Sequence, residues 1–206
     1  MNVNRLKIVV FDLDYTLWPF WVDTHVTPPF TKKNGNIVDS YGSKIKYYPE
    51  VPEVLRNLTE QGYEIGVASR TSEIDGANQL IKLFGWEQYF TYKEIFPGSK
   101  VTHFNNIKRK SNRHFDEMIF FDDESRNIYD INRLGVVSIL VKNGVNKLVV
   151  DNGIKQKAQK SRCQLTVWLL KKSSRTILLP HQWSQRRRIE WIELVNTPAA
   201  EEYAPR

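Results

Sequence analysis

The stretch Leu6-Lys7-Ile8-Val9-Val10-Phe11-Asp12-Leu13-Asp14-Tyr15-Thr16-Leu17 decides the fold of this chain. Residues 6–11 form a short apolar run that ends in acids, which is typical of a buried parallel strand. In parallel α/β sheets, sites form at the carboxyl ends of the strands. We therefore expect Asp12 and Asp14 to stand at a sheet edge that a ligand can reach.

Further strands and helices alternate along the chain. Short apolar runs predict strands over residues 65–68, 90–96, 118–121 and 136–141. Helices are expected over residues 52–61, 72–84 and 124–134, with Ser72 or Thr71 capping the second. The apolar stripe of this second helix comprises Ile74, Ala77, Leu80, Ile81 and Phe84. This alternation predicts an α/β fold, a three-layer Rossmann-like parallel sheet with helices on both faces.

Residues 17–48 interrupt this alternation. The segment is rich in Pro, Gly, Asn and aromatic residues, and Asn34-Gly35 is typical of a tight hairpin turn. We interpret it as an irregular excursion that supplies at most a small loop or hairpin cap.

The two acids of the opening stretch predict a cation. Residues i and i+2 of an extended chain share a face, so the Asp12 and Asp14 carboxylates can point into one pocket. Two carboxylates this close repel one another unless a cation lies between them. Oxygen ligands of this kind suit Mg²⁺, which binds few protein carboxylates and keeps room for water and phosphate.

Three further polar groups follow strands or the loops after them. Ser69-Arg70 can hold a phosphoryl oxygen, or can simply form a helix-capping turn. Lys100 can neutralise phosphate and restrain a nucleophile, or can be a solvated surface lysine. Asp122-Asp123 can bind metal, and can also favour the first turn of the following helix.

Other chemistries lack their residues. No Gly-x-x-x-x-Gly-Lys-[Ser/Thr] loop is present. The four histidines, His25, His103, His114 and His181, show no zinc spacing, and we expect a structural role for His25.

In their order and spacing, these segments resemble the haloacid-dehalogenase superfamily of phosphotransferases. The match comprises Asp-x-Asp-x-Thr at 12–16, Ser69, Lys100 and the acidic pair at 122–123. The longer strings over residues 12–25, 68–74, 97–104 and 120–124 are similar to the eukaryotic magnesium-dependent phosphatase branch. The resemblance covers residues from about 5 to 154.

The resemblance implies a role for each residue. Asp12 would be the nucleophile that forms an aspartyl-phosphate, and Asp14 would transfer protons. Mg²⁺ would be held by Asp12, by the main-chain carbonyl of Asp14 and by Asp123, with Asp122 in support. Phosphate would be held by the amides of Leu13 and Asp14 and by Ser69, Arg70 and Lys100.

Spacing limits the cap and therefore the substrate. The gap from Ser69 to Lys100 has room for one helix and one strand, so no full cap domain fits. An open site admits phosphate on a large molecule, and the resemblance implies phosphotyrosine on proteins or phosphorylated sugar–amine adducts. Trp18, Phe20 and Trp21 can form an aromatic rim for such leaving groups, or can pack in the core.

The net charge of +7 lies entirely in the C-terminal quarter. Residues 1–154 hold 19 basic and 19 acidic side chains, whereas residues 155–206 hold 11 and 4. We therefore expect a neutral phosphatase domain over 1–154 and a basic extension over 155–206. The basic extension leaves open two alternatives: a nucleic-acid end phosphatase, or a binding element for an acidic partner or membrane surface. The binding element would use Lys171-Lys172, Arg186-Arg187-Arg188, Trp168, Trp183 and Trp191.

The sequence also bears on location. It shows neither a signal peptide at its N-terminus nor an apolar run long enough for a membrane span, and Cys163 is its only cysteine. We expect a cytoplasmic protein, with the nucleus left open, that acts on a phosphorylated small molecule or phosphoprotein.

Overall fold

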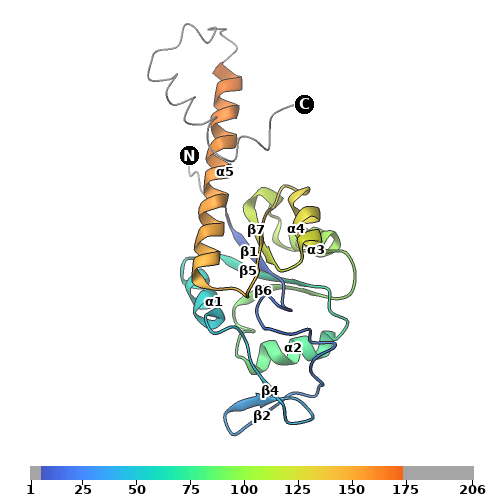
Figure 1. Cartoon of the computed structure of the whole chain (residues 1–206). Coiled ribbons are helices and arrows are strands. Elements are labelled where there is room, and N and C mark those ends of the chain that lie inside the picture. The colour runs from blue at the N-terminus through green and yellow to red at the C-terminus, as the bar shows by residue number, and fades with distance from the viewer. Residues whose placement is uncertain (1–5, 174–206) are drawn as a thin grey trace. The chain divides into compact units, whose positions relative to one another are not determined.

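The computed structural model of the chain describes residues 6–173 and centres on a five-stranded parallel sheet. The strand order is β6-β5-β1-β7-β8, which places β1 in the middle (Figure 1). The strands are β1 (Ile8–Phe11), β5 (Glu64–Ser69), β6 (Phe90–Ile95), β7 (Met118–Asp122) and β8 (Val137–Leu140). Every pairing is parallel. The predicted α/β sheet is confirmed.

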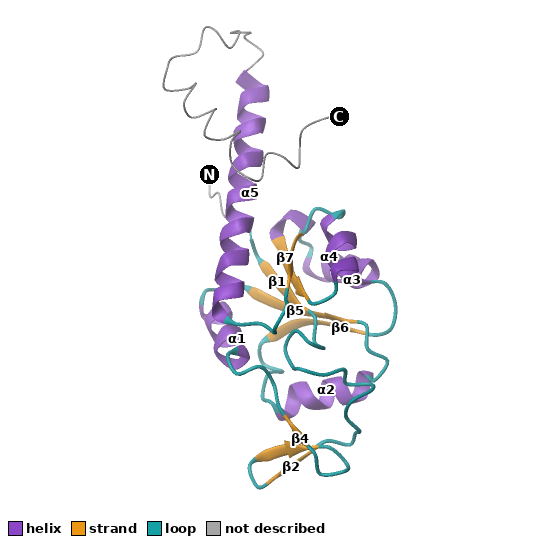
Figure 2. Cartoon of the chain, viewed as in Figure 1, coloured by secondary structure: helices purple, strands orange, loops and turns teal. Residues whose placement is uncertain are grey.

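Helices alternate with these strands along the chain, and α5 follows the last strand (Figure 2). They are α1 (Val51–Glu60), α2 (Ile74–Leu83), α3 (Lys100–Ser111), α4 (Ser125–Asn132) and α5 (Lys147–Ser173), with a short 3-10 turn at Phe115–Glu117. Helix α3 was not predicted from the sequence.

The alternation of side chains along β1 explains the three layers. Val9 and Phe11 belong to a core cluster with buried residues of α1 and α2. Ile8 and Val10 belong to a second cluster with Phe104 of α3 and residues of α4. Because successive side chains of a strand point to opposite faces, β1 contributes to both cores and is buried on both sides.

Helix α2 begins differently from the prediction. Its N-cap is Glu73, whose carboxylate accepts from the Gly76 amide at 3.1 Å, so the predicted cap at Ser72 or Thr71 is wrong. Thr71 instead accepts from the Glu73 amide at 3.2 Å, in the turn before the helix. The predicted stripe is also wrong at Ile74, which is 37% exposed in the first turn.

The excursion over 17–48 folds into a small antiparallel sheet. Its strands are β2 (Thr31–Lys33), β3 (Asn36–Val38) and β4 (Lys44–Ile45), in that order. The predicted hairpin turn is confirmed, because Asn34 and Gly35 have positive φ angles of 49° and 78°. The Phe30 amide donates to Gln79 of α2 at 2.7 Å, which ties the excursion to the main domain.

The chain divides after Ala158, into Met1–Ala158 and Gln159–Arg206. Arg186-Arg187-Arg188, Trp183 and Trp191 lie outside the described residues, as do the side chains of Trp168 and Lys171-Lys172. The binding role predicted for the tail therefore stays a prediction. Within residues 6–173, none of the helices has the length and apolar character that crossing a membrane requires.

Candidate active site

The predicted site residues meet at the carboxyl edge of the main sheet. Strand β1 lies between β5 and β7, so the ends of these three strands are neighbours. They open on a pocket of about 240 Å³. The predicted site residues that line the pocket are Asp12, Asp14, Trp21, Ser69, Arg70, Lys100 and Asp123. Leu13, the remaining predicted site residue, does not line the pocket, and its side chain is buried in the core.

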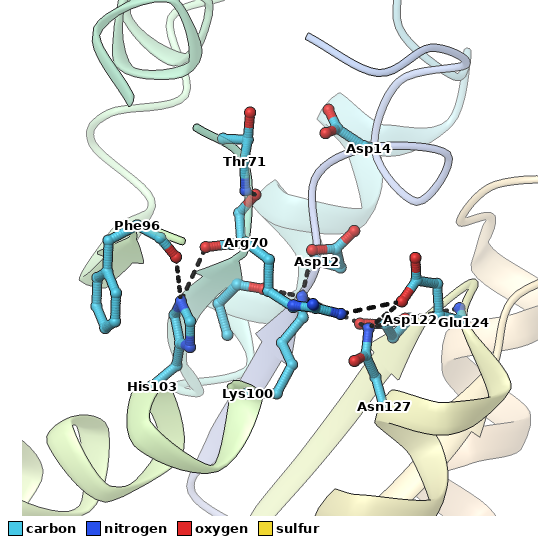
Figure 3. A network of polar contacts seen from close by, with 12 residues as sticks. Asp12, Asp14, Arg70, Thr71, Phe96, Lys100, His103, Asp122, Glu124 and Asn127 are labelled. Atoms are coloured by element: carbon cyan, nitrogen blue, oxygen red, sulfur yellow. Dashed lines mark hydrogen bonds and ion pairs between the residues drawn. The ribbon is translucent and has the colours of Figure 1, made fainter. Parts of the chain in front are cut away.

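The centre of the site is an ion network around Lys100 (Figure 3). The buried ammonium donates to the Asp12 carboxylate and to the Ala68 carbonyl, and its Nζ lies 3.1 Å from Asp122 Oδ2. Burial acts to lower the pKa of Lys100, but the two carboxylates raise it above its ordinary value. Lys100 is therefore a permanent cation beside Asp12, the position predicted for it.

Three carboxyl groups of the pocket hold protons more tightly than ordinary aspartates. Burial raises the pKa of Asp12 well above its usual range, against the effect of Lys100. Burial also raises the pKa of Asp14 and that of Asp123 to about 6. Nearby acids add to the shift, Asp23 for Asp14 and Asp122 for Asp123. A divalent cation would relieve this crowding of carboxylates.

Asp122 and Asp123 are adjacent in sequence but differ in their surroundings. Asp122 is fully buried, and its carboxylate accepts from the Glu124 amide at 2.7 Å and from Asn127 at 3.0 and 3.1 Å. With Lys100 at 3.1 Å, protein donors surround it. Asp123 lines the pocket instead. This difference favours Asp123 as the residue that faces a metal.

Asp14 is held by the excursion that follows it. Its Oδ1 accepts from the Trp18 indole at 2.6 Å and from the Val22 amide at 3.2 Å. In Figure 3 its carboxylate lies apart from the network that joins Lys100, Asp12 and Asp122. Both bonds end on Oδ1, so the excursion holds Asp14 by one oxygen of its carboxyl group.

Ser69 and Arg70 occupy the end of β5. The buried Ser69 hydroxyl accepts from the Thr71 amide at 3.4 Å. The Arg70 Nε donates to the Gly98 carbonyl at 2.8 Å, and its Nη1 lies 3.4 Å from Glu124 Oε2. These two anchors hold the Arg70 guanidinium across the pocket.

Of the three aromatic residues predicted for the rim, Trp21 alone lines the pocket. Trp21 is 47% exposed, whereas Trp18 and Phe20 are core residues, at 0% and 8%. Of the two alternatives left open for Trp18 and Phe20, core packing is confirmed: their rings stack on one another, and Trp18 also stacks on Trp86 of the main domain. His25 stacks on the Trp21 ring at 5.2 Å and accepts from the Trp21 amide at 3.1 Å, a structural role as expected.

The pocket also contains residues that sequence reasoning missed: Asp23, Thr71, Glu124, Arg126 and Asn127. Glu124, Arg126 and Asn127 belong to the cap and first turn of α4, directly after the strand that carries the acidic pair. The first turn of a helix that follows a site strand lies at the same sheet edge, and this signal could have found them.

Comparison with known proteins places the chain in a family. The model of the family described as Acid Phosphatase matches residues 5–160. The chain belongs to this family, in the magnesium-dependent phosphatase branch of the haloacid-dehalogenase superfamily. The resemblance drawn from the motifs is thereby confirmed.

Two curated relatives and two solved structures are similar to it. The human protein named Magnesium-dependent phosphatase 1 is 54% identical over 149 residues, which cover 72% of this chain and 85% of that protein. A HAD-like hydrolase superfamily protein of Schizosaccharomyces pombe is 43% identical over 161 residues, covering 71% and 93%. A haloacid dehalogenase-like family hydrolase from Streptococcus pneumoniae has a TM-score of 0.52 at 11% identity and covers 72% of this chain and 91% of its own. A putative phosphatase from Clostridium difficile has the same TM-score at 18% identity, with the same coverage. The two structures support the fold.

Proposed function

We propose that this chain is a Mg²⁺-dependent phosphomonoesterase in which Asp12 attacks phosphate. The observation that carries the proposal is the pairing of Asp12 with the buried Lys100 while Asp123 faces the same pocket. Lys100 orients the Asp12 carboxylate and favours its charged form against the effect of burial, and Asp123 leaves a second carboxylate for a cation. The names of the curated relatives, which include a magnesium-dependent phosphatase, agree with it.

The residues of the pocket fit Mg²⁺. Asp12 and Asp123 offer carboxylate oxygens, and Asp14 offers its main-chain carbonyl. Among the described residues, no group of three acidic, histidine or cysteine side chains gathers as a complete metal site. Mg²⁺ takes few protein carboxylates and completes its shell with water and substrate phosphate. When bound, Mg²⁺ offsets charge between carboxylate and phosphate and orients the phosphoryl group for in-line attack.

The chain's own residues divide the reaction into two displacements. The Asp12 carboxylate forms a bond to phosphorus while the bond from phosphorus to the leaving oxygen breaks, which gives an aspartyl-phosphate. Asp14 donates its proton to that leaving oxygen. Asp14 then takes a proton from water as water attacks phosphorus and releases Asp12. The raised pKa of Asp14, about 6, suits a group that must both give and take a proton near neutral pH.

The non-bridging phosphoryl oxygens would be held at the carboxyl ends of β1 and β5. The Ser69 hydroxyl, the Arg70 guanidinium and the amides of Leu13 and Asp14 are the donors we assign to them. Lys100, already shared between Asp12 and Asp122, contributes charge at the floor of the pocket.

For the leaving group, we infer phosphotyrosine on proteins or phosphorylated sugar–amine adducts. Trp21 supports this proposal, because it lines the pocket with half of its surface exposed and is backed by His25. An aromatic face at this place can stack on a tyrosyl ring or on the apolar face of a sugar.

The test is a comparison of hydrolysis rates by the full-length protein on a phosphotyrosine peptide, a phosphorylated sugar–amine adduct and a 3′-phosphorylated oligonucleotide. We expect turnover with Mg²⁺, loss of turnover in a chelator, and a mass gain of one phosphoryl group on Asp12 after acid quenching. Full activity in the chelator would overturn the proposal. If the oligonucleotide were hydrolysed fastest, the substrate class would be nucleic-acid ends, and the two inferred substrates would be wrong.

A further inference from the structure

A buried histidine joins the two segments that carry Ser69 and Lys100. His103 lies one turn after Lys100 on α3 and is fully buried. Its ring stacks on Phe96 with a centroid distance of 4.0 Å and an interplanar angle of 5°. The mechanism above does not use this residue.

The polar contacts of its ring are with three main-chain carbonyls of the segments that form the site. His103 Nε2 lies 2.9 Å from the Ser69 oxygen and 2.9 Å from the Phe96 oxygen. Nδ1 lies 2.8 Å from the oxygen of Ser99, the N-cap of α3. In Figure 3 the ring stands below Arg70 with a dashed contact toward Phe96.

Together with Lys100, His103 fixes the end of β5. Lys100 donates to the Ala68 carbonyl, and His103 contacts the next carbonyl, that of Ser69. Consecutive turns of α3 thus bind consecutive carbonyls of the strand that carries the Ser69 hydroxyl and Arg70. The Phe96 amide also donates to the Ser69 carbonyl, at 3.1 Å, so the loop before α3 is tied to the same atom.

The carbonyl contacts also decide which ring nitrogen carries the proton. Burial lowers the pKa of His103, which favours a ring with one proton. A nitrogen lone pair held against a carbonyl oxygen is repelled by it. Because Nε2 faces two carbonyl oxygens and Nδ1 faces one, a proton on Nε2 removes the larger repulsion.

We propose that His103 is a positioning residue of the phosphate site, and that its Nε2–H holds the Ser69 carbonyl and thereby the phosphate-binding end of β5. The proposal rests on the assignment of Ser69 and Arg70 to phosphate under the proposed function. His103 acts through these residues and touches neither phosphate nor the leaving group.

The test compares three substitutions of His103 in the full-length protein. Glutamine places its amide nitrogen three bonds from Cβ, as Nε2 is placed, whereas asparagine places its amide nitrogen at the distance of Nδ1. Leucine removes both. Binding of inorganic phosphate with Mg²⁺ present is measured by calorimetry, and melting temperatures are recorded for each variant. His114→Gln, at an exposed histidine outside the pocket, is the matched control.

We expect His103→Gln to bind phosphate about 3- to 10-fold more tightly than His103→Asn and His103→Leu. Two-bond nitrogen–proton NMR of the unsubstituted ring should show the proton on Nε2. Equal phosphate affinity of the Gln and Asn variants, or a proton on Nδ1, would overturn the proposal. The NMR result does not depend on turnover, so it separates a failure here from a failure of the proposed phosphatase function. If His103→Leu does not fold, the comparison of Gln with Asn still decides.

Discussion

The inner and outer halves of the pocket differ in burial and in how their charged side chains are paired. The inner half consists of the lining residues Asp12, Lys100 and Asn127 together with Asp122, which contacts Lys100 and Asn127; all four are buried, and their charges are paired within the protein. The outer half, Trp21, Asp23, Glu124 and Arg126, is open to solvent: the Arg126 and Glu124 side chains are 65% and 41% exposed. Buried charges depend strongly on their partners, whereas exposed pairs contribute little. We therefore expect the inner half to govern the chemistry and the outer half to adjust the choice of leaving group.

The largest effect should come from Asp12→Asn. This change removes the attacking carboxylate, so the phosphatase rate should fall by at least about 10⁴-fold. The measurement is steady-state hydrolysis of an aryl phosphate with saturating Mg²⁺. Circular dichroism of the same variant must show an intact fold. If the Asp12→Asn protein is folded and active, the expectation that the inner half governs the chemistry is wrong.

A sharper comparison is that of Asp122, which belongs to the inner half, with its neighbour Asp123, which is only partly buried. Asp123→Asn should raise the Mg²⁺ concentration for half-maximal activity by about 10- to 100-fold, with little change in melting temperature. Asp122→Asn breaks a buried pair with Lys100 and should cost about 3 kcal/mol of unfolding free energy, so its melting temperature should fall by about 6–12 °C. Magnesium titrations and thermal melts on both variants check this. If the two variants behave alike, the different surroundings of Asp122 and Asp123 have no functional meaning.

A third prediction concerns pH and uses the shifted carboxyl groups. The pKa of Asp14 and that of Asp123 rise to about 6 in the metal-free fold, from an ordinary value of about 4. Between these values the folded chain binds more protons than the unfolded chain, so these groups lose their stabilising contribution as pH rises through the window. Mg²⁺ needs deprotonated ligands and should therefore raise the melting temperature more at pH 7.5 than at pH 5.

The control for this measurement is Asp123→Asn, in which the difference between the two pH values should shrink. An equal Mg²⁺-dependent shift at both pH values in the unsubstituted protein would contradict the assignment of metal to these carboxylates.

The smallest effect should come from the outer half. Trp21→Ala should raise KM for an aryl phosphate by about 2- to 10-fold and leave kcat within about 2-fold, because in the proposed role the ring would contact the leaving group in both ground and transition state. Trp21→Phe should recover most of the loss. A fall in kcat as large as that of Asp12→Asn would mean that Trp21 takes part in the chemical step and not only in binding of the leaving group.

The sequence predicted the sheet and the placement of Asp12, Ser69 and Asp122 because these depend on one local pattern, an apolar strand that ends in acids or Ser69. It did not predict α3. The buried face of that helix consists of Lys100, His103, Phe104 and Ile107, which have helical spacing, but two of the four are polar. An apolar stripe was therefore not visible, and the role of His103 was hidden with it. The use of Asp122 inside the protein was also missed, since its partner Asn127 becomes a neighbour when α4 forms.

The contacts of Asp14 have a consequence for the engineering of this protein. The carboxyl group proposed to move the proton is held by Trp18 and Val22, which belong to the same excursion that presents Trp21 to the leaving group. A new loop grafted over residues 17–48 would change substrate preference and proton transfer together. A designer who wishes to alter the first alone must keep residues 18–22 and vary the hairpin beyond them.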